Sequence, residues 1–196
     1  MKSTNTLPEG YKEYYSINLQ QNKKTALLVN LLALLISVAM IVPMCFFVPF
    51  FTVFDTSNGI IPLFIRTASL IFLLIAYIIL HELVHGIAMK ICGTKKVKYG
   101  FTGMYAFAGS DDYYGKGAYI FIALAPVVLW GIVLAVINFL VPTEWIWIIY
   151  LIQITNISGA AGDFWVTAKF SSFPKEILIR DCGVGMTVYS LSDFPK

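Results

Sequence analysis

Charged residues are scarce in this chain of 196 residues, and this scarcity indicates the class of protein. Asp, Glu, Lys and Arg together make up 13% of the sequence, whereas hydrophobic residues make up 58%. A soluble domain carries about 25% charged residues. With a mean hydropathy of +0.76, the composition predicts a polytopic membrane protein whose environment is a lipid bilayer. The net charge of +3 is too small to indicate a nucleic acid partner.

Cysteine is also scarce, which argues against two kinds of structure. Cys45, Cys92 and Cys182 lie far apart and form no C-x-x-C pair. Neither a disulfide framework nor a cysteine-based zinc site is therefore expected. The first apolar run follows Lys23 and Lys24 and is too long for the apolar region of a cleavable signal peptide, so none is expected.

Long apolar runs are abundant and set the expected topology. A bilayer core requires about 20 apolar residues, and four runs reach that length, at about 25–54, 62–89, 117–143 and 145–168. Lysine and arginine concentrate before the first run, in the loop 90–116 and in the tail after the fourth run. Because positively charged loops stay in the cytoplasm, we expect a multi-pass protein of the cell membrane with both termini cytoplasmic.

The polar segments between these runs suggest short β structure. Residues 15–20 alternate as a strand would, although a flexible juxtamembrane arm is an equal alternative. Residues 97–108 predict a β-hairpin or a membrane-dipping loop, and residues 177–189 predict a second hairpin. The expected fold class is thus an all-α membrane protein with about four transmembrane helices and short β-hairpin elements on the cytoplasmic side. We expect a cytoplasmic arm (1–24), a four-span membrane domain (25–168) and a cytoplasmic tail (169–196).

The chain has only two histidines, and both belong to one motif inside the second apolar run. His81 and His85 are four residues apart, with Glu82 between them. On an α-helix this spacing places both imidazoles on one face, one turn apart, where they can bind one Zn²⁺. The glutamate of such a motif can deprotonate a water molecule at the metal. A charged residue in the middle of a membrane helix costs about 2.5–3.5 kcal/mol, which favours a functional role over that of a buried, hydrogen-bonded histidine pair.

A catalytic zinc site takes three protein ligands, and Asp163 is the candidate for the third. It is the acidic residue inside the fourth apolar run. At 1.5 Å per residue it lies about 9 Å inside the cytoplasmic boundary, and the histidine motif lies about 10 Å inside the same boundary. The alternative is an interfacial aspartate that is solvated by lipid headgroups.

Asn156 is a second polar residue in the fourth run. It precedes Asp163 by seven residues, so both lie on one helix face. Asn156 is a candidate catalytic residue that would donate to the substrate carbonyl or its oxyanion. A polar contact between helices is an equally good interpretation.

These motifs carry a resemblance to a known family. The segments 81–86, 123–126 and 156–163 resemble the bacterial zincin peptidases, a family of small membrane proteins similar to the site-2 protease clan. The resemblance covers most of the chain. It implies that His81, His85 and Asp163 bind zinc and that Glu82 is the general base.

The expected function is that of a membrane-embedded zinc metalloendopeptidase of the His-Glu-x-x-His type. Its substrate would be a membrane-associated polypeptide near the cytoplasmic face, because the peptide carbonyl must be exposed in an extended segment. The segment 97–108 is the candidate that lends a strand edge to this substrate, with an aromatic interfacial anchor as the alternative. Two other functions remain open: a non-catalytic membrane scaffold or binding protein, and a metal or proton transporter.

Overall fold

The computed structural model describes residues 3–18, 21–57, 59–103 and 105–191. The chain forms two compact units, each built from segments that are distant in sequence. The first unit contains residues 1–28, 82–126 and 163–196, and the second contains residues 29–81 and 127–162. The expected cytoplasmic arm and tail thus both belong to the first unit.

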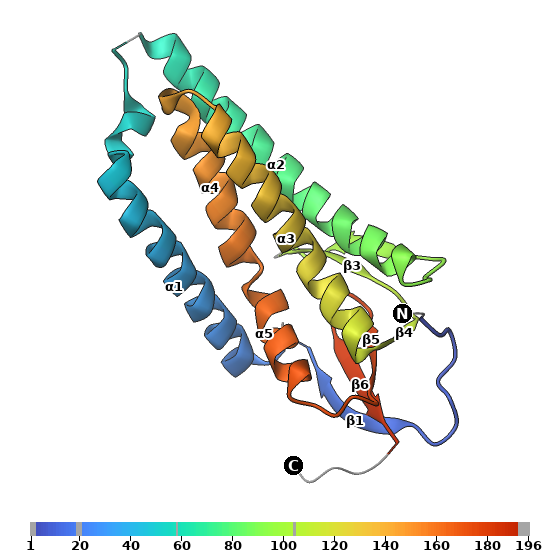
Figure 1. Ribbon diagram of the computed structural model, residues 1–196. Helices are drawn as coiled ribbons and strands as arrows, with labels where there is room; N and C mark the ends of the chain where they lie inside the picture. Colours follow the sequence, from blue (N-terminus) through green and yellow to red (C-terminus); the bar gives the residue numbers. More distant parts are fainter. Residues whose placement is uncertain (1–2, 19–20, 58, 104, 192–196) are drawn as a thin grey trace. The chain divides into compact units, whose positions relative to one another are not determined.

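The helices follow the apolar runs. Their bounds are Lys23–Phe47 for α1, Ile60–Ile91 for α2, Lys116–Leu140 for α3, Thr143–Gly159 for α4 and Ala161–Ser171 for α5, with a short 3₁₀ helix η1 at Phe50–Phe54 (Figure 1). Within the described residues, α1, α2, α3 and the stretch Thr143–Ser171 are long and apolar enough to cross a membrane. The prediction of a mostly helical chain with four such helices is confirmed.

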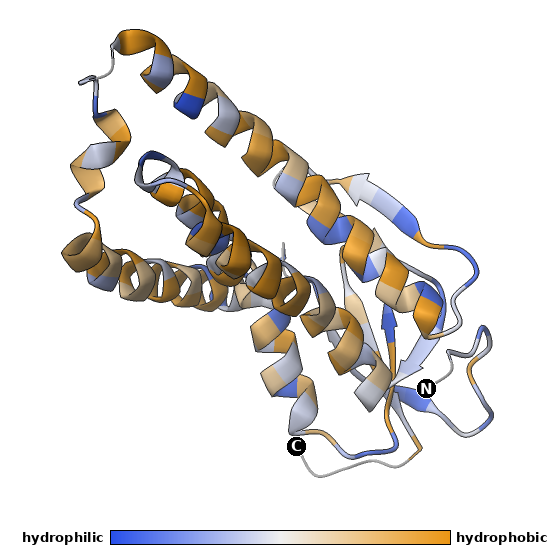
Figure 2. Cartoon of the chain, turned by 45° about the horizontal axis from the view of Figure 1, so that its top comes forward, coloured by the Kyte–Doolittle hydropathy of each residue, from blue (hydrophilic) through white to orange (hydrophobic). Residues whose placement is uncertain are grey.

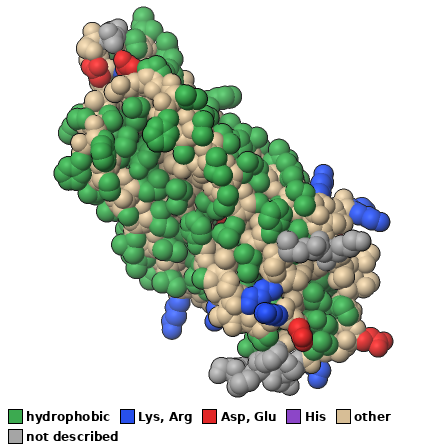
Figure 3. Space-filling model, in the orientation of Figure 1, with side chains coloured by type: hydrophobic (Ala, Val, Ile, Leu, Met, Phe, Trp, Pro, Cys, Tyr) green, Lys and Arg blue, Asp and Glu red, His purple; other side chains and the backbone are tan. Residues whose placement is uncertain are grey.

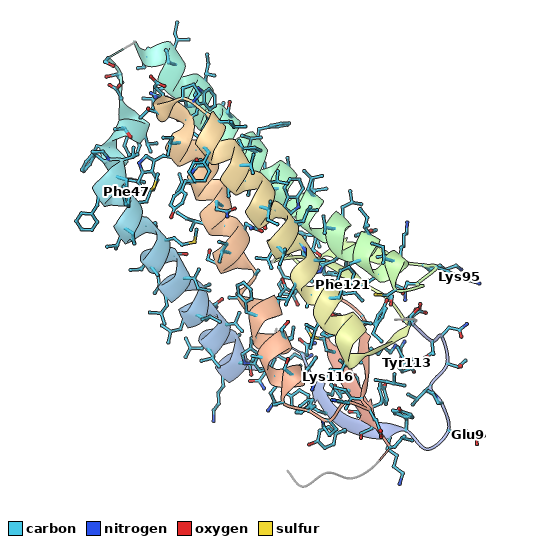
Figure 4. All side chains as sticks on the ribbon, viewed as in Figure 1. Glu9, Phe47, Lys95, Tyr113, Lys116 and Phe121 are labelled. Atoms are coloured by element: carbon cyan, nitrogen blue, oxygen red, sulfur yellow. The ribbon has the colours of Figure 1, made fainter. Side chains whose placement is uncertain are left out.

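The helices consist mostly of hydrophobic residues (Figure 2), and many of their large apolar side chains are exposed. No described residue of α1 is buried, and Phe47, which projects away from α1 in Figure 4, is 83% exposed. Phe139 near the end of α3 is 90% exposed. Hydrophobic side chains also cover most of the face seen in Figure 3, where lysine and arginine are few. Such surfaces are unfavourable in water and compatible with a multi-pass membrane protein.

The first unit contains a four-stranded antiparallel sheet. Its strands, in spatial order, are β1 (Lys12–Ile17), β6 (Met186–Ser190), β5 (Leu178–Asp181) and β4 (Tyr113–Gly115). The strand expected at 15–20 is present but lies earlier, at Lys12–Ile17, and residues 19 and 20 lie outside the described part of the chain. Its partner is the second strand of the tail hairpin. This pairing explains why the two ends of the sequence belong to one unit.

A separate hairpin in the same unit confirms the strand prediction for the segment 97–108. Strand β2 (Lys98–Phe101) pairs antiparallel with β3 (Ala106–Gly109). The Phe107 ring packs so tightly against Gly100 and Gly183 that a Cβ at either glycine would overlap it. Because Gly183 lies between β5 and β6, this contact fixes the hairpin to the turn of the tail.

The hydrophobic core of the first unit joins helices and strands. Its buried residues include Met89 of α2, Tyr119 and Ile122 of α3, Phe170 of α5 and Ile179 of β5. Tyr114 of β4 is also part of this core. Its hydroxyl is hydrogen-bonded to the hydroxyls of Thr94 (2.5 Å) and Ser110 (2.6 Å). These bonds satisfy three buried polar groups at once, as a buried hydroxyl requires.

The second unit is helical and has a smaller core. The buried residues of that core are Tyr77 of α2, Leu134 of α3, and Ile149 and Ile152 of α4. Helix α4 also hydrogen-bonds to α1 and to the residue after it, since Tyr150 donates to the Met40 carbonyl of α1 (3.0 Å) and Trp147 Nε1 donates to the Val48 carbonyl (3.1 Å).

The fourth apolar run differs from the expectation of one continuous span. Helix α4 ends at Gly159, Ala160 has φ −79° and ψ 12°, and α5 begins at Ala161. Gly159 and Gly162 lower the helix propensity here, and the Ser158 hydroxyl donates back to the Ile154 carbonyl (2.7 Å), a bond associated with helix bending. As a result Asp163 lies in the first turn of α5.

Candidate metal centre

Helix α2 carries the histidine motif without interruption. His81, Glu82 and His85 are all helical, and all three are partly buried. The continuous helix places the two imidazoles one turn apart on one face, as the sequence predicted. The division of the chain into units falls within this turn, with His81 in the second unit and His85 in the first.

Asp163 lies next to His85 within the first unit. Its Oδ2 is 3.7 Å from His85 Nε2, and the two side chains are 25% and 12% exposed. Two ligands of a tetrahedral ion with bonds of about 2.1 Å are separated by about 3.4 Å. The observed separation is close to that value, so small side-chain adjustments would allow both atoms to bind one ion.

One ligand atom from each of His81, His85 and Asp163 lies within 4.8 Å of the others. Among the described residues this is the one group of histidine, cysteine and acidic side chains with such an arrangement. Two imidazole nitrogens and one carboxylate oxygen are a donor set that catalytic zinc uses, with a fourth position left for water or substrate. The residues therefore fit Zn²⁺.

His85 is oriented by a backbone carbonyl. Its Nδ1 is 2.9 Å from the Ile122 oxygen on α3, and because a carbonyl can only accept, Nδ1–H is the donor. In a regular helix the Ile122 carbonyl would accept from the N–H of residue 126. Residue 126 is Pro126, inside α3, and proline has no N–H. Pro126 thus releases the carbonyl that His85 uses.

His81 is oriented by side chains of the second unit. The Tyr77 hydroxyl lies 2.7 Å from His81 Nδ1 and donates to Asn156 Oδ1 at 2.9 Å. Asn156 Nδ2 in turn donates to the Val127 carbonyl at 3.2 Å. Tyr77 is 7% exposed and Asn156 is fully buried, so this chain of hydrogen bonds is shielded from solvent.

Asn156 is thus part of the surroundings of His81. Its contacts link it to Tyr77 and Val127, and the contact with substrate expected from the sequence stays a prediction. The sequence analysis did not identify Tyr77 at all. A signal was present, because Tyr77 precedes His81 by four residues and therefore lies on the same helix face.

The β2–β3 hairpin contacts the histidine motif. The Tyr99 ring lies over Gly86, the residue after His85, so closely that a Cβ at position 86 would overlap the Tyr99 hydroxyl. Gly86 follows Glu82 by four residues and shares its helix face. The absence of a side chain at Gly86 therefore allows β2 to approach the face of α2 that carries Glu82.

The tail hairpin is bonded to the helix that supports His85. Tyr119 of α3 donates to Asp181 Oδ2 (2.7 Å), and the Gly183 N–H donates to Asp181 Oδ1 (2.8 Å). Burial raises the pKa of the Asp181 carboxyl, although both hydrogen bonds oppose that shift. Among exposed side chains, hydrogen bonds from Lys98 and Arg180 hold the pKa of Asp111 below its ordinary value. The bond between Tyr119 and Asp181 fixes the carboxyl-terminal strands relative to α3 within the first unit.

The protein is mostly helical, and its His-Glu-x-x-His motif lies beside an aspartate. These two features together are those of a candidate metallopeptidase. Residues 74–178 match the sequence profile of the family described as "Putative zincin peptidase". The match covers more than half of the chain, which therefore belongs to this family. Comparisons with curated proteins and with solved structures find no match.

Proposed function

We propose that this protein is a membrane-embedded zinc metallopeptidase that hydrolyses peptide bonds of membrane-associated polypeptides. The observation that carries the proposal is the convergence of His81, His85 and Asp163 around one point, with Glu82 on the same turn of α2. Membership of the zincin peptidase family supports the same reaction class.

Each residue of the site has a distinct role in this proposal. His81, His85 and Asp163 hold the metal. A bound Zn²⁺ supplies Lewis-acid chemistry, which polarises a carbonyl and acidifies a water molecule. Glu82 accepts the proton of the attacking water and returns it to the leaving amine.

The position of the site in the membrane determines which polypeptides can reach it. We propose that α1, α2, α3 and the stretch 143–171 cross the bilayer, with both termini in the cytoplasm. Lys90 in the last turn of α2 and the lysines that follow the helix, at positions 95, 96 and 98, favour a cytoplasmic end for that helix. The histidine motif then lies about two turns from the cytoplasmic boundary, where the unwound end of a membrane-anchored polypeptide can reach it.

We propose that the outer edge of strand β2 binds the substrate. Among the described strands, β2 pairs with β3 alone. The Thr102 N–H bonds to the Tyr105 carbonyl, and since inward and outward N–H groups alternate in an antiparallel strand, those of Tyr99 and Phe101 point away from β3. An extended peptide can pair with such an edge, and the Tyr99–Gly86 contact brings that edge to the metal centre.

The decisive test separates metal binding from hydrolysis. Glu82→Gln keeps the metal ligands, so the purified variant should contain as much zinc as the wild type. It should lose cleavage of a single-span reporter polypeptide whose cytoplasmic end is extended. Glu144→Gln, at the start of α4, is the matched control and should cleave normally. Wild-type cleavage by Glu82→Gln would refute the mechanism, and zinc binding without cleavage in the wild type would favour a scaffold.

A further inference from the structure

The hydrogen-bond chain Val127–Asn156–Tyr77–His81 has a defined direction. It starts at the Val127 carbonyl, which can only accept, so Asn156 must present its amide nitrogen there. The Asn156 oxygen then faces Tyr77 and also can only accept. The single proton of the Tyr77 hydroxyl is therefore directed to Asn156.

This direction sets the proton on His81. Because the Tyr77 proton points to Asn156, the Tyr77 oxygen is an acceptor toward His81, and Nδ1–H of His81 is the donor across the 2.7 Å separation. A neutral imidazole carries one ring proton. The lone pair of His81 is thus on Nε2, the form in which that nitrogen binds a metal.

We propose that Tyr77 and Asn156 are positioning residues that hold His81 as its Nδ1–H tautomer and fix its ring for the metal. The inference rests on the proposed function in so far as the metal is Zn²⁺. It assigns Asn156 a role through Tyr77 and His81, distinct from contact with the substrate.

The strength of the effect follows from the low polarity around the chain. Tyr77 and Asn156 are buried, and water does not readily replace a lost partner at such a position. Loss of an outer partner of a metal-binding histidine lowers metal affinity about 10–100-fold. The Tyr77→Phe change removes the acceptor for Nδ1–H, so His81 is free to place its proton on Nε2 and to rotate.

The two histidines of the sequence make this measurable without any activity assay. Protein labelled with ¹⁵N-histidine gives the signals of His81 and His85 alone. In metal-free wild-type protein at alkaline pH, both rings should show a protonated Nδ1. In Tyr77→Phe the His81 signals should shift toward the Nε2–H form, while the His85 signals, which depend on the Ile122 carbonyl, should stay unchanged.

Zinc affinity, measured by competition with a chelator, provides the second readout. Tyr77→Phe should weaken zinc binding about 10–100-fold. Tyr150→Phe is the matched control, because it removes another tyrosine hydroxyl of the second unit that donates to a backbone carbonyl. It should bind zinc as the wild type does.

The role of Asn156 is tested by a double-variant cycle. Asn156→Leu leaves the Tyr77 proton without its acceptor, so the hydroxyl can turn toward His81, and zinc affinity should fall. Because the residues act as one chain, Tyr77→Phe combined with Asn156→Leu should lose no more affinity than the stronger single change. Additive losses would overturn the proposed chain.

The inference and the proposed function can fail separately. Wild-type zinc affinity together with unchanged His81 signals in Tyr77→Phe would overturn the inference, whatever the activity of the protein. If Tyr77→Phe behaves as expected but Glu82→Gln still cleaves, the inference stands and the peptidase mechanism is wrong. The tautomer measurement needs no zinc, so it decides the inference even if another metal is the natural one.

Discussion

His85 and His81 lie one turn apart on α2, yet they are oriented by different kinds of partner. In the first unit a backbone carbonyl accepts from His85, and that carbonyl is released from its helix by Pro126. In the second unit two side chains, Tyr77 and Asn156, connect His81 to the Val127 carbonyl. Both arrangements end at a carbonyl, which can only accept, and both therefore fix the proton on Nδ1.

The difference shows how each orientation can be lost. A backbone carbonyl cannot be removed by substitution, so the partner of His85 changes only through Pro126 or through movement of α3. The hydrogen bond at His81 Nδ1 is made to a side chain, the phenolic oxygen of Tyr77. The first arrangement is resistant to most substitutions, whereas the second is sensitive to the loss of one atom.

The largest expected effect is the loss of a ligand, which should be equal for the two histidines. Purified wild-type protein should contain about one Zn²⁺ per chain, and both His81→Ala and His85→Ala should contain almost none when measured by elemental analysis. If one variant keeps its full zinc content, the comparison fails, because only one of the two histidines then binds the metal.

The second largest expected effect is a loss of cleavage when the β2–β3 hairpin is altered. Among the described residues, only the first unit contains such a hairpin. Phe101→Pro removes an N–H that points away from β3, so β2 and β3 can remain paired. Cleavage of the reporter polypeptide should fall at least about tenfold, because one good hydrogen bond of about 1.4 kcal/mol corresponds to that factor. Zinc content should stay normal.

Phe101→Ala is the control for this change, because it removes the exposed apolar ring but keeps the N–H. Under the edge hypothesis it should cleave more efficiently than Phe101→Pro. Equal losses in the two variants would identify Phe101 as an aromatic membrane anchor instead.

The smallest expected effect tests the role of Pro126. Pro126→Ala restores a helical N–H that competes with His85 for the Ile122 carbonyl. A carbonyl has two lone pairs, so we expect zinc affinity to fall only about threefold to tenfold, at the lower end of the effect of an outer partner. The His85 signals should shift while the His81 signals stay unchanged, the reverse of Tyr77→Phe.

Pro43→Ala provides the control for Pro126→Ala, since Pro43 also lies inside a long apolar helix. It should change neither zinc affinity nor the histidine signals. Because Pro126→Ala adds a helical hydrogen bond, reduced zinc binding would not be explained by a less stable helix. If the His85 tautomer and the zinc affinity both stay unchanged, the Ile122 carbonyl accepts from His85 and from the new N–H at position 126 together, and the role assigned to Pro126 is wrong.

Local sequence patterns were sufficient for several features. Four apolar runs of membrane-spanning length predicted the long helices α1, α2 and α3 and the helical stretch Thr143–Ser171, because helix formation in such runs depends on composition and length. The spacing of His81 and His85 gave their common face, since positions four apart on a helix lie one turn apart. Alternation and turn residues also indicated the strands of the arm, the hairpin and the tail.

The remaining features depend on contacts between distant segments, which local patterns do not encode. The pairing of β1 with β6 and the approach of Tyr99 to Gly86 are set by packing. The association of Asp163 with His85 was expected from similar depth in the membrane, but the separation of 3.7 Å is a property of the tertiary structure.

The sequence by itself determined the helical class and the placement of the two histidines on one helix face, because both follow from residues that are close together in the chain. The tertiary structure alone decided how the histidines are held. Tyr77 meets Asn156 across 79 residues, and His85 meets Ile122 across 37 residues. Hydrogen bonds between such distant groups form only after the helices pack, and buried donors and acceptors must then find partners among the groups that packing brings close.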